Sequence, residues 1–166
     1  MDIRGNVATR MQKLMDRAEL DATVLALAGL LRLNFAVTPK ARLTGEGVPD
    51  GLLATILELD IMLPCVGQGA IGLEARKGDG RIAGICERLN DYSTMQCVTA
   101  ERAFLAAMGG GCQSPVGAYA EARGENIQLR AVSFENQKVR RADATRSVRE
   151  PAELGRQVAD AVKNAG

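Results

Sequence analysis

The stretch VGAYAEARGENIQLRAVSFENQKVRRADA, residues 116–144, decides the fold of the second half of this 166-residue chain. It holds three segments of strand-like composition, at residues 116–120, 127–134 and 138–144. The connections between them, residues 123–126 and 135–137, are short and polar, as in β-hairpins. The stretch therefore predicts a three-stranded antiparallel sheet.

Helical patterns flank this predicted sheet. Residues 81–89 and 91–108 precede it, with Asp91 or Ser93 as the N-cap of the longer helix, and residues 152–163 follow Pro151. The positions expected to face inward are Ile82, Ile85, Leu89, Val98, Phe104, Leu105, Met108, Leu154, Val158, Ala161 and Val162. Helices that cover one antiparallel sheet form an α+β domain, which we place at residues 78–166.

The first half has a different pattern, in which short apolar runs alternate with helix signals. Asn6 is a candidate N-cap for a helix over residues 7–17, and residues 29–33 resemble the first turn of another. The apolar runs at residues 21–28, 56–64 and 70–75 predict strands, and residues 66–69 predict a tight turn. We therefore expect an α/β domain over residues 1–77.

Composition restricts the function. The chain is 46% hydrophobic and 25% charged with a net charge of +1, so its overall charge gives no argument for binding nucleic acid or an anionic membrane. No apolar run is long enough to span a bilayer, and residues 1–5 do not resemble a signal peptide. We expect a cytoplasmic protein with no nucleic-acid or membrane partner.

The four cysteines are Cys65, Cys86, Cys97 and Cys112. They form no CxxC pair and the chain has no histidine, so we expect neither a metal site nor a disulfide framework. Cys86 and Cys97 fall within helical patterns and are interpreted as core residues. Cys65 adjoins a glycine-rich turn, where packing is the simpler interpretation.

Cys112 differs from the others because it lies in GGGCQSP, residues 109–115. Three glycines remove side-chain cover from the thiol, and the proline at 115 restricts the exit of the chain. This setting predicts an exposed, reactive thiol. The alternative, a small residue in a turn that ends a helix, stays open at this point.

Arginines give the second functional signal. Arg4 and Arg10 bracket the predicted start of the first helix, and Arg32 follows the glycine junction at Gly29. Such junctions gather at one edge of an α/β sheet, where ligands usually bind, and guanidinium groups form bidentate pairs with carboxylates. The competing interpretation is that all three are solvated charges at helix ends.

Five motifs occur in order along the chain: Arg4-Gly5-Asn6-Val7 with Thr9-Arg10, Leu25-Ala26 with Ala28-Gly29-Leu30 and Arg32-Leu33, Leu63-Pro64 with Val66-Gly67-Gln68-Gly69-Ala70, Thr99-Ala100-Glu101-Arg102-Ala103, and Gly110-Gly111-Cys112-Gln113 with Pro115 and Gly117. Together they resemble the hydroxymethylbilane synthases, also called porphobilinogen deaminases. This family condenses four porphobilinogen molecules with release of ammonia in tetrapyrrole biosynthesis, which includes haem biosynthesis.

The resemblance implies a cofactor and its site. The family carries a dipyrromethane bound through a thioether to the cysteine of the glycine loop, which is Cys112 here. Arg4, Arg10 and Arg32 match positions that hold the carboxylates of the cofactor and growing chain, and Ala26 and Gly29 match backbone near the cofactor. Porphobilinogen would be the small-molecule substrate, and no metal is implied.

The resemblance covers the C-terminal half of the family: the later part of a periplasmic-binding-like second domain, residues 1–77, and the third domain, residues 78–166. The family's catalytic aspartate belongs to an earlier part, so no catalytic residue can be assigned in this chain. We expect the 166-residue chain alone to be inactive, with Cys112 as a free thiol. Family members are usually monomeric. In this chain residues 70–75 would lack their sheet neighbours and leave an apolar edge, so we expect either self-association or a disordered first half, with residues 78–166 the more self-sufficient unit.

Two alternatives from other classes remain at this stage. One is a non-catalytic module in which the arginines hold a carboxylate or phosphate ligand and Cys112 is incidental. The other is a domain that serves mainly in folding or protein interaction.

Overall fold

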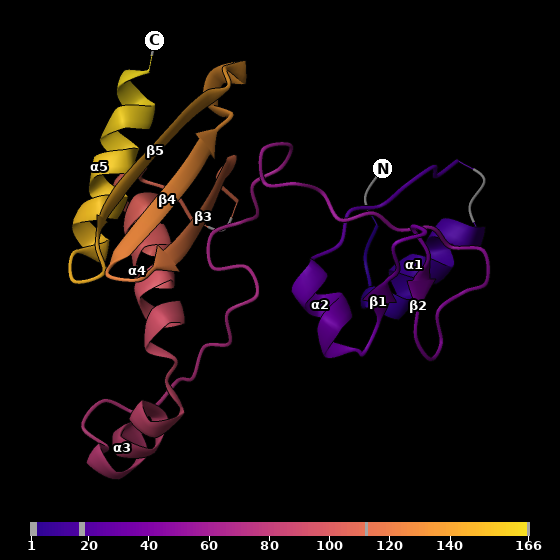
Figure 1. Ribbon diagram of the computed structural model, residues 1–166, viewed down its shortest axis with the longest axis horizontal. Helices are drawn as coiled ribbons and strands as arrows, with labels where there is room; N and C mark the ends of the chain where they lie inside the picture. Colours follow the sequence, from indigo (N-terminus) through magenta and orange to yellow (C-terminus); the bar gives the residue numbers. More distant parts are fainter. Residues whose placement is uncertain (1–2, 17–18, 112, 166) are drawn as a thin grey trace. The chain divides into compact units, whose positions relative to one another are not determined.

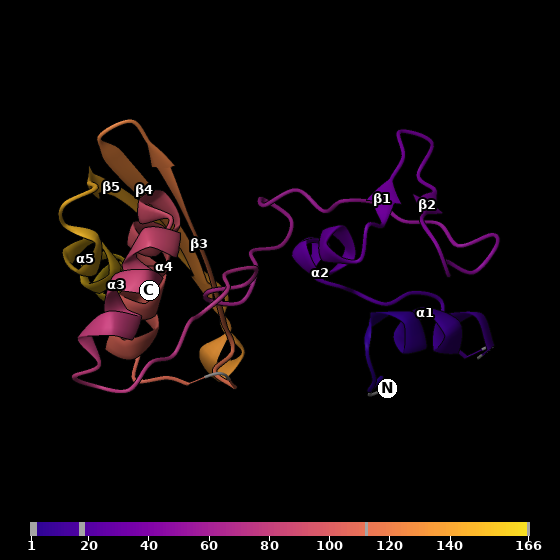
Figure 2. The ribbon, with the colours of Figure 1, turned by 90° about the horizontal axis from the view of Figure 1, so that it is seen from below.

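A computed structural model of the chain describes residues 3–16, 19–111 and 113–165 (Figures 1 and 2). The chain divides into two compact units, Met1–Ile61 and Met62–Gly166. Within the described residues no helix is both long enough and apolar enough to cross a bilayer.

The second unit is built on a three-stranded antiparallel sheet in the order β3-β4-β5. Its strands are β3 (Val116–Arg123), β4 (Asn126–Ser133) and β5 (Arg140–Ser147). In this register Ala131 of β4 lies between Ala118 of β3 and Ala142 of β5. A short 3-10 turn, η1 (Glu135–Gln137), connects β4 to β5. The antiparallel sheet predicted from residues 116–144 is confirmed.

Two helices, α4 (Tyr92–Ala107) and α5 (Pro151–Asn164), cover one face of this sheet (Figure 1). Phe104 of α4 and Leu154 of α5 are fully buried together with Ile127 and Leu129 of β4. Each of these apolar side chains contributes on the order of 2 kcal/mol by leaving water. The unit is therefore a two-layer α+β structure around a single core.

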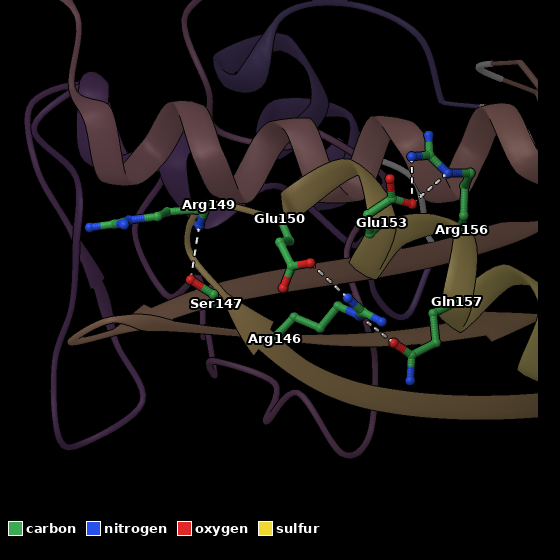
Figure 3. Close-up of polar contacts among 7 residues, drawn as sticks. All are labelled: Arg146, Ser147, Arg149, Glu150, Glu153, Arg156 and Gln157. Atoms are coloured by element: carbon green, nitrogen blue, oxygen red, sulfur yellow. Dashed lines mark hydrogen bonds and ion pairs between the residues drawn. The ribbon is translucent and has the colours of Figure 1, made fainter.

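Polar contacts fix the start of α5 after β5 (Figure 3). Arg146 reaches forward from the end of β5: its Nε donates to Oε1 of Gln157 at 2.7 Å, and one terminal nitrogen lies 3.1 Å from Glu150. Glu153 pairs with Arg156 within the first turns of the helix. These pairs are exposed, so they orient the helix more than they stabilise it.

Helix α3 (Gly80–Leu89) forms where the apolar spacing predicts a helix, and Asp79 caps it by accepting a hydrogen bond from the Ile82 amide at 3.0 Å. The predicted inward face is wrong. Ile85 and Leu89 are 44% and 70% exposed, because α3 lies beyond the start of α4 and no element of the sheet covers it (Figure 1).

Three cysteines and one alanine also depart from the predicted core. Cys86 of α3 and Cys97 of α4 are half-buried rather than buried, and Cys65, for which packing was the simpler interpretation, is exposed. In α5, Ala159 is buried where Ala161 was expected, because the helix turns its Leu154–Val158–Val162 face to the sheet.

The first unit is small. Its elements in the described residues are α1 (Val7–Asp16), α2 (Leu27–Arg32), β1 (Ala36–Val37) and β2 (Leu43–Thr44), the last two forming a short antiparallel hairpin. Their apolar side chains meet in a cluster of Met11, Leu30, Phe35, Leu43 and Leu52. The Asn6 cap of α1 is confirmed, since its Oδ1 accepts a hydrogen bond from the Thr9 amide at 2.8 Å.

The strands predicted at residues 21–28, 56–64 and 70–75 are wrong. No described residue in these ranges belongs to a strand, and α2 begins inside the first of them. Val24, Ile61 and Ile71 are all more than 60% exposed. An apolar run becomes a strand only when a neighbouring strand takes up its backbone hydrogen bonds. Pro64 accepts a hydrogen bond from the Ala118 amide of β3, but no ladder of strand pairing forms in any of the three ranges. The tight turn at residues 66–69 does form.

Candidate functional site

The glycine-rich loop between α4 and β3 is the strongest candidate site. At its start, the amides of Gly109 and Gly110 donate to the carbonyls of Ala106 and Leu105, at 3.0 and 3.2 Å. Gly109 has a φ of 75°, a conformation that favours glycine at the end of a helix. The glycines therefore end α4 and turn the chain into the loop.

The middle of the loop is held by a reciprocal pair of hydrogen bonds. The Gly111 amide donates to Oγ of Ser114 at 2.9 Å, and the Ser114 amide donates to the carbonyl of Gly111 at 2.9 Å. A Cβ at Gly110 would collide with Oγ of Ser114, so this position needs glycine. Cys112 itself lies outside the described residues, but the residues that bracket it are closely pinned.

Both ends of the loop are anchored to the folded core. Lys163 of α5 donates from Nζ to the carbonyl of Ala107 at 2.6 Å, where α4 ends. On the other side, the Phe134 amide donates to the carbonyl of Pro115 at 2.8 Å. A lysine at a helix C-terminus also offsets the partial negative charge of the helix end. The loop is thus a defined platform with exposed residues at Gly111 and Gln113.

Arg4 and Arg10 lie at the start of α1, in the first unit. Nε of Arg10 donates to the carbonyl of Gly5 at 2.8 Å, and Nζ of Lys13 donates to the carbonyl of Arg4 at 2.8 Å. These bonds hold the entry to the helix from two sides. Within the part of the chain that the structure describes, the terminal nitrogens of Arg10 make no further hydrogen bond or ion pair, so they can receive a carboxylate.

Ala26, Gly29 and Arg32 lie on or beside α2. Ala26 precedes the helix and its carbonyl accepts from the Gly29 and Leu30 amides, at 3.0 and 3.3 Å. A Cβ on Gly29 would lie 3.8 Å from Cγ2 of Val7, so the first turns of α1 and α2 are neighbours. Arg32 is exposed in the last turn of α2. Of the predicted positions, Gly29 is thus close to the start of α1, which lies between Arg4 and Arg10.

The structure reveals a buried ionisable residue, Glu101, that was not predicted as a site residue from the sequence. It is only 6% exposed, in the middle of α4. Its Oε2 accepts from the Gly67 amide at 2.6 Å and its Oε1 accepts from the Ala120 amide at 2.9 Å. Burial raises its pKa, and these two hydrogen bonds act in the opposite direction.

A signal for this burial was present in the sequence. Glu101 precedes Phe104, Leu105 and Met108 by three, four and seven residues, so helical periodicity places it on the inward face of α4. It borders a hollow of about 410 Å³ that is entirely within the second unit. The side chains around this hollow include Cys65, Cys97, Tyr119 and Glu121.

Comparisons with known proteins identify both parts of the chain. Residues 1–84 match the family described as "Porphobilinogen deaminase, dipyromethane cofactor binding domain", and residues 95–164 match "Porphobilinogen deaminase, C-terminal domain". No group of three or more metal-ligating side chains that could hold an ion occurs among the described residues.

Individual relatives agree with these matches. The porphobilinogen deaminase of Roseiflexus sp. (strain RS-1) is 39% identical over the whole chain and half of its own length. That of Moorella thermoacetica is 41% identical over 96% of the chain and 47% of its own length, and that of Staphylococcus aureus (strain Newman) is 34% identical over 99% and 49%. The chain spans about half the length of the curated relatives it matches. It belongs to the porphobilinogen deaminase family.

Proposed function

We propose that this chain provides the C-terminal half of a hydroxymethylbilane synthase, a transferase that condenses four porphobilinogen molecules and releases ammonia at each step. The observation that carries the proposal is the order of the two family matches, cofactor-binding domain first and C-terminal domain second, over nearly the whole chain. In this proposal the enzyme works in the cytoplasm on a small-molecule substrate.

Cys112 is the proposed attachment point of the dipyrromethane. Its thiol would form the carbon–sulfur bond at the aminomethyl carbon of a porphobilinogen unit, while the carbon–nitrogen bond breaks and the amine leaves as ammonia with the proton of the thiol. The loop around it supports this role: the glycines that precede Cys112 leave space for a bulky group, and the hydrogen bonds between Gly111 and Ser114 order the backbone on both sides. Once bound, the cofactor supplies the pyrrole end to which further units are added.

Arg4, Arg10 and Arg32 are the proposed partners of the acetate and propionate groups. Each porphobilinogen unit carries two carboxylates, so a growing chain needs several guanidinium groups. The terminal nitrogens of Arg10 are suited to this because its Nε is already used to fix the side chain on Gly5. Ala26 and Gly29 provide the nearby backbone.

We also propose the family's domain division for this chain. Residues 1–77 would be the later part of a periplasmic-binding-like α/β domain and residues 78–166 the third domain. The helices and hairpin of the first unit are compatible with part of an α/β domain. No acidic residue in the chain matches the family's catalytic aspartate by motif, so the 166-residue chain alone is proposed to be inactive.

Intact-mass spectrometry tests the proposal. The chain is incubated with porphobilinogen, either alone or together with the N-terminal half of the Roseiflexus relative, expressed separately. We expect no mass gain alone, and a gain of two pyrrole units when both halves are present. The gain should disappear in Cys112→Ser and persist in the matched control Cys65→Ser. A gain that survives in Cys112→Ser overturns the attachment site, and hydroxymethylbilane formed by the chain alone overturns its inactivity.

A further inference from the structure

We propose that the Glu101 carboxylate is a latch that fastens residues 63–69, here called the strap, to the outer edge of β3. In this inference the strap can detach while α4, α5 and the sheet stay folded. The strap is the part of the second unit that leads from its beginning to the exposed segment before α3 (Figure 1).

The latch rests on one carboxylate that joins three elements. Glu101 belongs to α4, and its two oxygens accept hydrogen bonds from Gly67 of the strap and from Ala120 of β3. Both bonds are short, at 2.6 and 2.9 Å, and charge-assisted bonds of this kind are about twice as strong as neutral ones. Because the carboxylate is buried, losing either bond leaves a polar group without water.

The edge of β3 shows why the strap depends on a side chain. β4 pairs with one side of β3, and the strap covers the other side without forming a strand. A main-chain hydrogen bond joins them, from the Ala118 amide to the carbonyl of Pro64 at 3.0 Å. The next outward amide along β3, that of Ala120, is taken by Glu101. The carboxylate therefore accepts the hydrogen bond from Ala120 that a main-chain carbonyl would accept if the strap were a β-strand.

The core does not depend on the strap. Its buried members are contributed by α4, α5, β3 and β4, with half-buried alanines of β5 packed against them. The strap's Val66 likewise packs against this core only as a half-buried side chain. Leu63 is buried beside Gly117, where the carbonyl of Leu63 comes within 3.0 Å of the position a Cβ would occupy. Detachment would expose these two apolar side chains and the β3 edge, which is a partial opening of the kind seen in native-state hydrogen exchange.

Amide hydrogen exchange of the whole chain tests the latch. Glu101→Gln keeps the size of the side chain but has one acceptor oxygen and an NH₂ group that faces an N–H donor. We expect the Gly67, Ala120 and Ala118 amides to exchange about tenfold faster or more in this variant, with the Leu129 amide of β4 unchanged. Glu121→Gln is the matched control, because Glu121 is an exposed carboxylate on the same strand that pairs with Arg123.

The Ala118 amide decides the outcome, because it bonds to the strap and not to Glu101. If Gly67 and Ala120 accelerate while Ala118 does not, two bonds are lost without detachment and the latch is wrong. Equal acceleration of Leu129 would also overturn it, since Glu101 would then support the whole unit. If the variant does not fold, exchange of the native chain at increasing urea concentrations still tests the proposal. The exchange rate of the Gly67 amide should depend less on urea than that of the Leu129 amide, because detachment of the strap exposes less surface than unfolding. Equal urea dependences would contradict a detachable strap.

Discussion

The α-carbon of Gly155 in α5 lies directly against the carbonyl oxygen of Ala100 in α4. A Cβ built at Gly155 would collide with this oxygen and come within 2.6 Å of both the Ala103 Cβ and the Phe104 nitrogen. The two helices therefore cross with their backbones in close contact, which only glycine permits. The close approach of the two helices helps to bury Phe104 and Leu154, which are both fully buried.

Gly155→Ala should destabilise the second unit by about 3 kcal/mol, because the added methyl group meets backbone that cannot move aside. The measurement is urea unfolding followed by circular dichroism. Gly84→Ala is the matched control: Gly84 is exposed inside α3 with open space around it, so the same substitution should be neutral or stabilise by up to about 1 kcal/mol. A loss of stability at Gly84 equal to that at Gly155 would contradict the crossing.

Lys163→Met should loosen the end of α4. The change keeps an apolar side chain of similar length but removes the hydrogen bond from Nζ to the Ala107 carbonyl. We expect a loss of about 0.5–1 kcal/mol and faster exchange of the Gly109 and Gly110 amides, which follow directly. Lys77→Met, at an exposed position before α3, serves as the control and should change neither quantity. Unaltered exchange at Gly109 and Gly110 in Lys163→Met would show that the loop does not rely on this contact.

The stability of the native chain relative to Glu101→Gln should depend on pH. Burial raises the pKa of Glu101 in the folded protein, so the folded state binds this proton more tightly than the unfolded state. The contribution of Glu101 to the free energy of unfolding is therefore complete below the ordinary glutamate pKa, and it is lost as the pH rises through the raised pKa of the folded protein. We would measure the free energy of unfolding of both proteins in urea between pH ~4 and pH ~8. The native chain should become more stable relative to the variant as the pH falls. If the stability of the native chain relative to the variant is constant with pH, or increases with pH, Glu101 is not a buried carboxyl group with a raised pKa.

Cys65 should react with iodoacetamide faster than Cys97. Cys65 is exposed, whereas Cys97 is half-buried beside the Ala122 amide, and burial raises the pKa of its thiol with further contributions from Glu101 and Glu121. Because only the thiolate reacts, we expect alkylation of Cys97 to be about tenfold slower or more at pH ~8. Peptide mass spectrometry of timed samples measures both rates. In urea, where both thiols are exposed, the two cysteines should react at equal rates. Equal rates in the folded chain as well would contradict the burial of Cys97.

Local patterns account for the elements that were predicted correctly. The alternating residues of β3, β4 and β5, the polar turns between them, and the caps Asn6 and Asp91 depend on interactions within a few residues. The family resemblance likewise rests on short motifs, and the comparisons confirm it. The roles of Cys112, Arg4, Arg10 and Arg32 stay predictions.

Interactions between distant segments decided the rest. The apolar runs at residues 21–28, 56–64 and 70–75 look like strands by composition, but a strand needs a partner and composition does not say whether one is present. The same holds for Ile85 and Leu89, whose helix forms without a surface to cover them.

The sequence by itself determined the antiparallel sheet, its two covering helices and the family, since alternation, capping and motifs are written in neighbouring residues. Only the tertiary structure decided that Glu101 bridges Gly67 to Ala120, and that Gly155 meets Ala100. The partners in these contacts are 34, 19 and 55 residues apart in the chain. The physical reason is that burial and close packing depend on which surfaces meet, and no local pattern specifies the partner.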